Sequence, residues 1–153
     1  MKFIQNTSDI LLALGVAGKH RSPIKDFCID SRKAKKNSIF IGLTGSNEDG
    51  SKYCDDAFSN GAVFAIIKAK KRMNANKLKD NTLSVSNPEK ALAQLAQVAL
   101  KNFIGPVIGI TGSNGKTTTK NILSTGIKNS FSTFKNFNNE IGLPLCALML
   151  DSK

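Results

Sequence analysis

Val107–Lys120 reads VIGITGSNGKTTTK, and this stretch decides how the second half of the chain is interpreted. Val107–Ile110 predicts a buried strand, Thr111–Gly115 predicts a turn of glycine and small residues, and a helix is expected to open at Lys116 and continue through Ile127. A strand, a glycine-rich loop and a helix in this order are typical of a loop that binds phosphate groups. The expected ligand is a nucleoside triphosphate with magnesium.

Each residue type in this loop has a chemical reason to be there. Gly112 and Gly115 permit backbone conformations closed to other residues, so that successive N–H groups can point at one anion near a helix N-terminus. Lys116 adds a mobile positive charge for the terminal phosphates and is the candidate catalytic residue, and the Thr117 hydroxyl is the candidate magnesium ligand. The residues predicted to contact ATP in this loop are Gly112, Ser113, Asn114, Gly115, Lys116, Thr117 and Thr118.

The loop departs from the general pattern GxxxxGK[ST] in one position. That pattern requires glycine at position 110, where the chain has Ile110, and Gly109 comes one place too early. The shorter form TGSNGKTT, Thr111–Thr118, fits instead, with Gly112 making the turn. A glycine-rich turn with an incidental lysine is the alternative interpretation.

The shorter loop resembles that of the Mur ligases, ATP-dependent amide-bond-forming enzymes of peptidoglycan synthesis, whose version is TG(T/S)xGK(T/S)(T/S). Asn136–Leu145, NFNNEIGLPL, is similar to a segment of the family member that acts on UDP-N-acetylmuramoyl-tripeptide and D-alanyl-D-alanine. Ile29–Gly50 resembles the DSR…DG pattern of the nucleotide-sugar domain. The resemblance implies those two substrates, ATP and Mg²⁺, with reaction through an acyl phosphate.

The resemblance also assigns candidate substrate residues near the start of the chain. Asp30-Ser31-Arg32 offers a carboxylate, a hydroxyl and a guanidinium, which suit a ribose and a diphosphate. The resemblance places Ser31 and Arg32 on the UDP portion of the precursor, and Gly45 and Asp49 lie in a polar loop that is a plausible rim of the same site. A polar turn with a local ion pair explains the tripeptide equally well. The family usually continues Asp-Gly with His, but Ser51 stands here, so that role is not carried over.

Two asparagines after the next predicted strand complete the candidate site. By resemblance Asn138 and Asn139 face the nucleotide or the substrate, and their amides can both donate and accept hydrogen bonds. As an alternative, Asn139 caps a helix over Glu140–Leu150.

The predicted fold class is α/β, with a small mixed α/β nucleotide-sugar domain at residues 1–86 and a connecting helix at 87–104. Residues 105–153 are expected to begin a phosphate-loop ATPase domain with a parallel sheet. Further helices are predicted over Asp9–Leu14 with Ser8 or Thr7 as cap, Asp55–Asn60 and Glu89–Phe103, and strands over Lys25–Asp30, Ile39–Leu43, Ala62–Ile67, Thr82–Val85 and Ser130–Phe134. Lys68–Lys79 is expected to be an exposed basic segment.

The composition of the chain limits the classes of binding partner that we expect. The net charge of +11 permits binding to nucleic acid or to anionic membranes, but the lysines are dispersed and lack interleaved aromatics, so we expect no nucleic-acid partner. No stretch approaches the roughly 20 apolar residues that span a bilayer, so we expect no membrane insertion. Three scattered cysteines lack the spacing of a zinc or redox site. The default expectation is a cytoplasmic, monomeric protein.

The sequence does not supply every part of a ligase. Glu140 is the single acid between Glu89 and Asp151, so no second magnesium ligand is evident, and the family's remaining metal-site residues are expected beyond residue 153. The apolar face of Leu145–Leu150 is expected to lack partners. We therefore expect the 153-residue chain to be inactive alone. Alternatives are a sibling ligase that adds the third amino acid, a cyanophycin or folate relative, a non-catalytic nucleotide-binding or UDP-sugar-binding module, and a DNA-binding ATPase.

Overall fold

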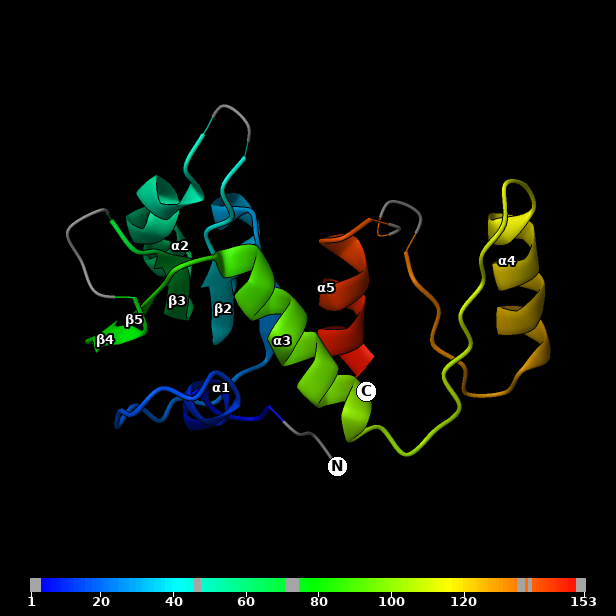
Figure 1. Ribbon diagram of the computed structural model, residues 1–153, viewed down its shortest axis with the longest axis horizontal. Helices are drawn as coiled ribbons and strands as arrows, with labels where there is room; N and C mark the ends of the chain where they lie inside the picture. Colours follow the sequence, from blue (N-terminus) through cyan, green and yellow to red (C-terminus); the bar gives the residue numbers. More distant parts are fainter. Residues whose placement is uncertain (1–3, 46–47, 71–74, 135–136, 138, 151–153) are drawn as a thin grey trace.

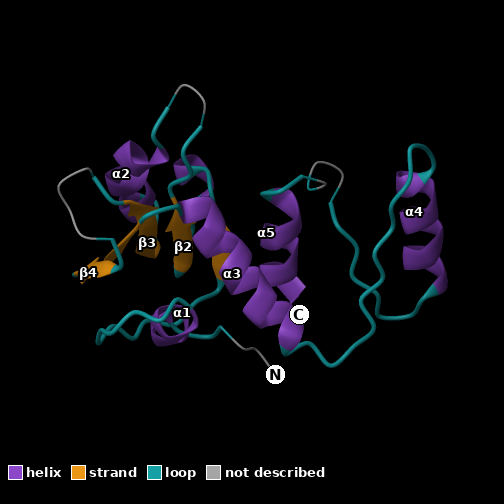
Figure 2. Cartoon of the chain, viewed as in Figure 1, coloured by secondary structure: helices purple, strands orange, loops and turns teal. Residues whose placement is uncertain are grey.

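The computed structural model describes residues 4–45, 48–70, 75–134, 137 and 139–150. Its centre is a five-stranded sheet in the order β1-β2-β3-β5-β4, in which β1, β2, β3 and β5 are parallel and β4 is antiparallel (Figures 1 and 2). The elements are α1 Thr7–Ala13, β1 Asp26–Cys28, the 3-10 turn η1 Ser31–Lys33, β2 Ser38–Ile41, the 3-10 turn η2 Gly50–Tyr53, α2 Cys54–Ser59, β3 Ala62–Lys68, β4 Lys77–Lys79, β5 Thr82–Val85, α3 Pro88–Lys101, α4 Lys116–Gly126 and α5 Gly142–Met149. The mixed α/β class is confirmed.

The two central strands are apolar on both faces. Ile39 and Ile41 of β2 pack into the larger core together with the alternate residues Phe64 and Ile66 of β3. Phe40 lies between Ile39 and Ile41 in sequence and faces the smaller core on the other side. Because side chains alternate along a strand, this pattern requires helices on both faces of the sheet.

Helices meet that requirement unequally. The larger core contains residues of α1, α3 and α5, and the smaller core is closed by α2 through Ala57 and Phe58. Helix α3 starts one residue before the predicted Glu89, with Pro88 at its first position and the Asn87 Oδ1 atom accepting from the Lys90 N–H at 2.6 Å. The predicted caps of α1 were wrong, because the cap residue is Asn6, whose N–H donates to Asp9 Oδ2 at 2.9 Å.

The two strands predicted around the phosphate loop are not formed. Val107–Ile110 and Ser130–Phe134 have no strand structure, and the Val107 and Ile108 side chains are 63% and 55% exposed. A strand is stable only when a neighbour satisfies its backbone groups, and in the described residues neither segment pairs with the five-stranded sheet. The strand-helix-strand crossover expected here is therefore absent, although its helix, α4, is present.

The expectation for the last helix was also wrong. Leu145 and Leu148 of α5 are 2% and 4% exposed and belong to the larger core, and α5 packs beside α3 and near β1. Figure 1 shows α5 next to α3, whereas α4 stands apart from both. The apolar face finds its partner in the first half of the chain because α3 presents an apolar face of its own there.

The basic segment Lys68–Lys79 contains an element that the charge pattern concealed. Lys77–Lys79 is β4, an edge strand whose lysine side chains are exposed while Leu78 packs against the larger core. Lysines on an edge strand discourage pairing with other chains.

None of the helices in the described part of the chain combines the length and apolar character needed to cross a bilayer.

Candidate functional site

The first candidate site lies at the carboxyl edge of the parallel sheet. Asp30 follows β1, the loop from Thr44 to Asp49 follows β2, and Asn87 follows β5. The ends of parallel strands meet at one edge, which is where ligands of open α/β sheets bind. The predicted substrate residues Ser31, Arg32, Gly45 and Asp49 therefore follow neighbouring strands at the same edge of the sheet, although residues 46 and 47 of the loop lie outside the described residues.

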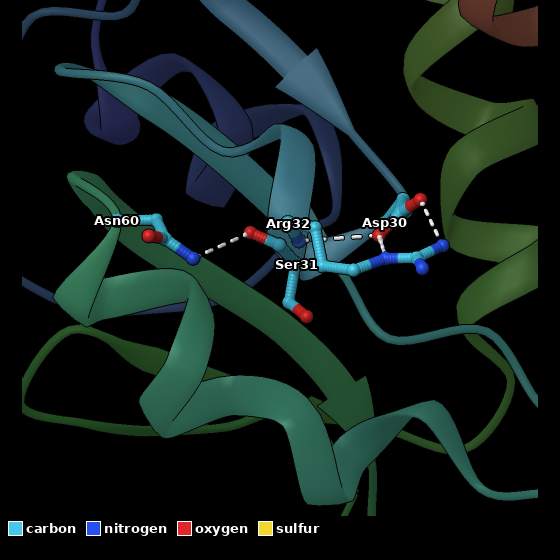
Figure 3. Close-up of polar contacts among 4 residues, drawn as sticks. All are labelled: Asp30, Ser31, Arg32 and Asn60. Atoms are coloured by element: carbon cyan, nitrogen blue, oxygen red, sulfur yellow. Dashed lines mark hydrogen bonds and ion pairs between the residues drawn. The ribbon is translucent and has the colours of Figure 1, made fainter.

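Asp30 and Arg32 form a two-pronged ion pair at the end of β1. The Arg32 Nε atom donates to Asp30 Oδ1 and its terminal nitrogen donates to Asp30 Oδ2, both at 2.9 Å, as Figure 3 shows. The Arg32 N–H also donates to Asp30 Oδ1, so this carboxylate caps η1. Hydrogen bonds from Arg32 lower the pKa of Asp30, and the same contact raises the pKa of Arg32.

The local ion pair that the sequence left as an alternative is therefore present. The ion pair leaves hydrogen-bond donors of Arg32 free for a ligand, because the arginine side chain is 87% exposed and a guanidinium has five donors. Ser31 is 8% exposed, and its backbone carbonyl accepts from Asn60 Nδ2 at 3.1 Å (Figure 3). Asn60 anchors η1 to α2, a role that no sequence pattern indicated.

Backbone hydrogen bonds close the loop after β2 at its base. The Gly45 N–H donates to the Glu48 carbonyl at 2.8 Å, and the Gly50 N–H donates to the Leu43 carbonyl at 2.9 Å. Asp49 Oδ1 accepts from the Ser51 N–H at 2.9 Å, and hydrogen bonds from Ser51 lower the pKa of Asp49. Asp49 is thus partly occupied as the cap of η2, and Gly45 holds the turn.

A second polar cluster lies immediately beside this loop. Glu48 accepts from the Tyr53 hydroxyl at 2.7 Å and from the Lys52 ammonium at 3.0 Å, and the Lys52 Nζ atom lies 5.0 Å from the centre of the Tyr53 ring. These hydrogen bonds, that from Tyr53 first, lower the pKa of Glu48. The Ser51 hydroxyl accepts from the Lys68 N–H at 3.2 Å and joins η2 to the end of β3.

The phosphate loop has the backbone that its glycines predicted. Gly112 and Gly115 have φ angles of +145° and +78°, and Gly115 leads directly into α4 at Lys116. These angles favour glycine. The first N–H groups of an α-helix have no partner within the helix, which is why a helix N-terminus after such a loop is a candidate anion site. The Lys116 ammonium folds back and donates to the Gly112 carbonyl and, at 3.4 Å, to the Ser113 carbonyl.

The remaining loop residues are exposed. None of the residues of α4 is buried, and Ser113, Asn114, Thr117 and Thr118 all face solvent. The Thr117 hydroxyl in the first turn fits one position of a magnesium shell whose other ligands are phosphate oxygens and water. Among the described residues no group of three or more His, Cys, Asp or Glu side chains gathers as a metal site.

Asn139 stabilises the start of α5, as its alternative interpretation suggested, although the cap residue itself is Ile141. Its Oδ1 atom accepts from the Gly142 N–H at 2.7 Å, at the start of α5. Asn138, the other candidate from this segment, lies outside the described residues. The phosphate loop and the carboxyl edge of the sheet are not brought together, since α4 stands away from the sheet (Figure 1).

Comparison with known families assigns both halves of the chain. The model of the Mur ligase family, catalytic domain, matches residues 23–99, which is half of the chain, and that of the Mur ligase middle domain matches residues 110–153. The chain belongs to the Mur ligase family.

Its relatives within the Mur ligases include proteins named UDP-N-acetylmuramoyl-tripeptide--D-alanyl-D-alanine ligase. That of Buchnera aphidicola is 34% identical over 99% of this chain and 33% of its own length, and that of Bacillus subtilis is 37% identical over 79% of this chain and 27% of its own. The structure of the MurF ligase from Thermotoga maritima in complex with ADP is 38% identical, with a TM-score of 0.68 over 81% of this chain and 29% of that one. The chain spans about a third of the length of these curated relatives.

Proposed function

We propose that this Mur ligase chain supplies the precursor site and the phosphate loop of an ATP-dependent ligase that joins D-alanyl-D-alanine to UDP-N-acetylmuramoyl-tripeptide. The observation that carries the proposal is the loop at Gly112–Lys116, whose two left-handed glycines and lysine open α4. The names of the relatives support the choice of substrates. A cytoplasmic location, a monomeric state and a role in cell-wall synthesis belong to the same proposal.

In the proposed reaction the precursor carboxylate attacks the γ-phosphate of ATP, forming a C–O–P bond while the bond to ADP breaks. The amine then attacks the acyl carbon and phosphate leaves. Lys116 and the N–H groups from Ser113 to Thr118 stabilise the charge that moves onto the phosphate oxygens, because preorganised donors cost no reorganisation during transfer. Mg²⁺, bound at Thr117, would neutralise the triphosphate.

The residues at the carboxyl edge of the sheet support a proposal for how the precursor is held. Arg32 presents free guanidinium donors toward solvent at the carboxyl edge and suits a diphosphate, which accepts bidentate hydrogen bonds. Asp30 fixes the direction of that guanidinium. We propose that Ser31, Gly45 and Asp49 complete the precursor site, and that Asn138 and Asn139 lie near the nucleotide.

A chimera tests the proposal, in which residues 1–153 replace the matching part of the Bacillus subtilis relative. We expect phosphate release that requires ATP, the UDP-precursor and D-alanyl-D-alanine, and we expect Lys116→Ala to abolish it. The 153-residue chain alone is expected to release no phosphate. Release that is supported equally by a free amino acid in place of the dipeptide would contradict the proposed substrate and favour the sibling ligase.

A further inference from the structure

Glu89 makes a contact that its position in the helix does not require. An acidic residue in the first turn of α3 is expected, because it interacts favourably with the positive end of the helix. Its Oε1 atom, however, accepts from the Thr44 N–H at 2.7 Å, across 45 residues of sequence. The carboxylate therefore joins the helix after β5 to the loop after β2.

This contact fixes what the loop's own hydrogen bonds leave open. The bonds from Gly45 to Glu48 and from Gly50 to Leu43 close the base of the loop. They set its internal shape, but they contain no atom of α3 and so do not hold the loop against that helix. The bond from the Thr44 N–H to the Glu89 Oε1 atom does so.

Thr44 lies next to one candidate precursor residue and pairs with another. Gly45 follows it directly, and Asp49 forms an isolated β-bridge with it. Any movement of the Thr44 peptide therefore moves both residues relative to Arg32 on the neighbouring strand end. We infer that Glu89 is a positioning residue of the UDP-precursor site, an inference that rests on the proposed function.

The carboxylate acts through its acceptor oxygen and not through its charge. A diphosphate bound at this edge is anionic, so a negative charge nearby is mildly unfavourable for binding. Glutamine keeps an oxygen that can accept from the Thr44 N–H and removes the charge, whereas alanine removes both. The two substitutions consequently separate positioning from electrostatics.

Binding of UDP-N-acetylmuramoyl-tripeptide to the 153-residue chain, measured by calorimetry, tests this inference. We expect Glu89→Ala to weaken binding about fivefold and Glu89→Gln to stay within about twofold of the unsubstituted chain. The control is Asp56→Ala, which removes an exposed acid from the first turn of α2 and is expected to leave the affinity unchanged. ATP affinity should not change in any of the three.

Amide exchange of Thr44, followed by NMR without ligand, provides a readout that does not depend on binding. Its N–H should exchange faster in Glu89→Ala and at the original rate in Glu89→Gln. Unchanged affinity in Glu89→Ala together with faster exchange would overturn the positioning role alone. Failure of the unsubstituted chain to bind the precursor would instead overturn the proposed precursor site, and the inference with it.

Discussion

Substitution of Gly50 by alanine tests the shape of the loop at the carboxyl edge, because Gly50 lies where no side chain fits. A Cβ atom at this position would be 2.5 Å from the Leu43 carbonyl oxygen and 2.9 Å from the Leu43 nitrogen, whereas ordinary contacts begin near 3.4 Å. Both neighbours are backbone atoms, so neither can rotate away. Gly50→Ala must therefore push the two ends of the loop apart by about 1 Å.

Two costs follow from that displacement. The hydrogen bond from the Gly50 N–H to the Leu43 carbonyl, now 2.9 Å, is lost, at about 1 kcal/mol. Forcing an extra carbon into a packed site adds about 2 kcal/mol. The free energy of unfolding should fall by about 3 kcal/mol, which lowers the urea midpoint by about 1.5 M if the denaturant slope is about 2 kcal/mol per M.

Urea unfolding followed by tyrosine fluorescence measures this loss. Tyr53 is the single tyrosine, the chain has no tryptophan, and η2 ends at this residue, so the signal reports on the site itself. The matched control is Gly45→Ala in the same loop, where the nearest atom to a Cβ is the Glu48 carbonyl oxygen at an ordinary 3.5 Å. Equal midpoints for the two variants would refute the described packing of the loop.

Three further outcomes are expected. The carboxyl of Asp30, followed by NMR, should titrate below its ordinary pKa, and its pKa should return toward the ordinary value in Arg32→Ala. The contribution of Asp30 to stability should therefore be complete above about pH 4 and be lost on further acidification. An unchanged titration in Arg32→Ala would contradict the ion pair. Asn139→Ala should lower the free energy of unfolding by about 1 kcal/mol, because the Gly142 N–H at the start of α5 loses its acceptor, whereas Glu140→Ala should not. Burial raises the pKa of Cys28 to about 11 from 9.0, so the folded state retains a proton that the unfolded state loses. The free energy of unfolding should therefore fall by about 2 kcal/mol between pH 9 and 11. The fall should be smaller in Cys28→Ala.

The first half of the fold was predictable because its signals are local. β2 and β3 are largely apolar runs, and α2 ends one residue before the predicted Asn60, with Gly61 at φ +107° close behind. The helix predicted over Glu89–Phe103 likewise begins within one residue of Pro88, the first residue of α3. In each case the residues that define the element also stabilise it, through burial or capping.

The second half was less predictable because its strands depend on partners. Val107–Ile110 has the composition of a strand, yet a strand needs a neighbour, and the described residues supply none to it. The apolar helix α5, in contrast, was expected to lack a partner but packs against α3. Composition indicated that this face would be buried, but not against which element.

The candidate site shows the same division. The glycines and lysine of the phosphate loop were readable because their backbone angles and charge follow from residue type. Contacts between distant segments were not, as with Glu89 and Thr44 or Asn60 and Ser31, since each depends on how strands are placed side by side. The sequence predicted Glu89 as the first residue of a helix, which does not indicate its contact with Thr44.

The central claim is that the loop before α4 is a triphosphate site, and ATP affinity in the presence of Mg²⁺ tests it most directly. Calorimetry should detect ATP binding to the unsubstituted chain and a loss of tenfold or more, on the order of 1.5 kcal/mol or above, in Lys116→Ala. Lys128→Ala, an exposed lysine just beyond the same helix, should bind ATP as the unsubstituted chain does. Equal affinity of Lys116→Ala and the unsubstituted chain would contradict the claim.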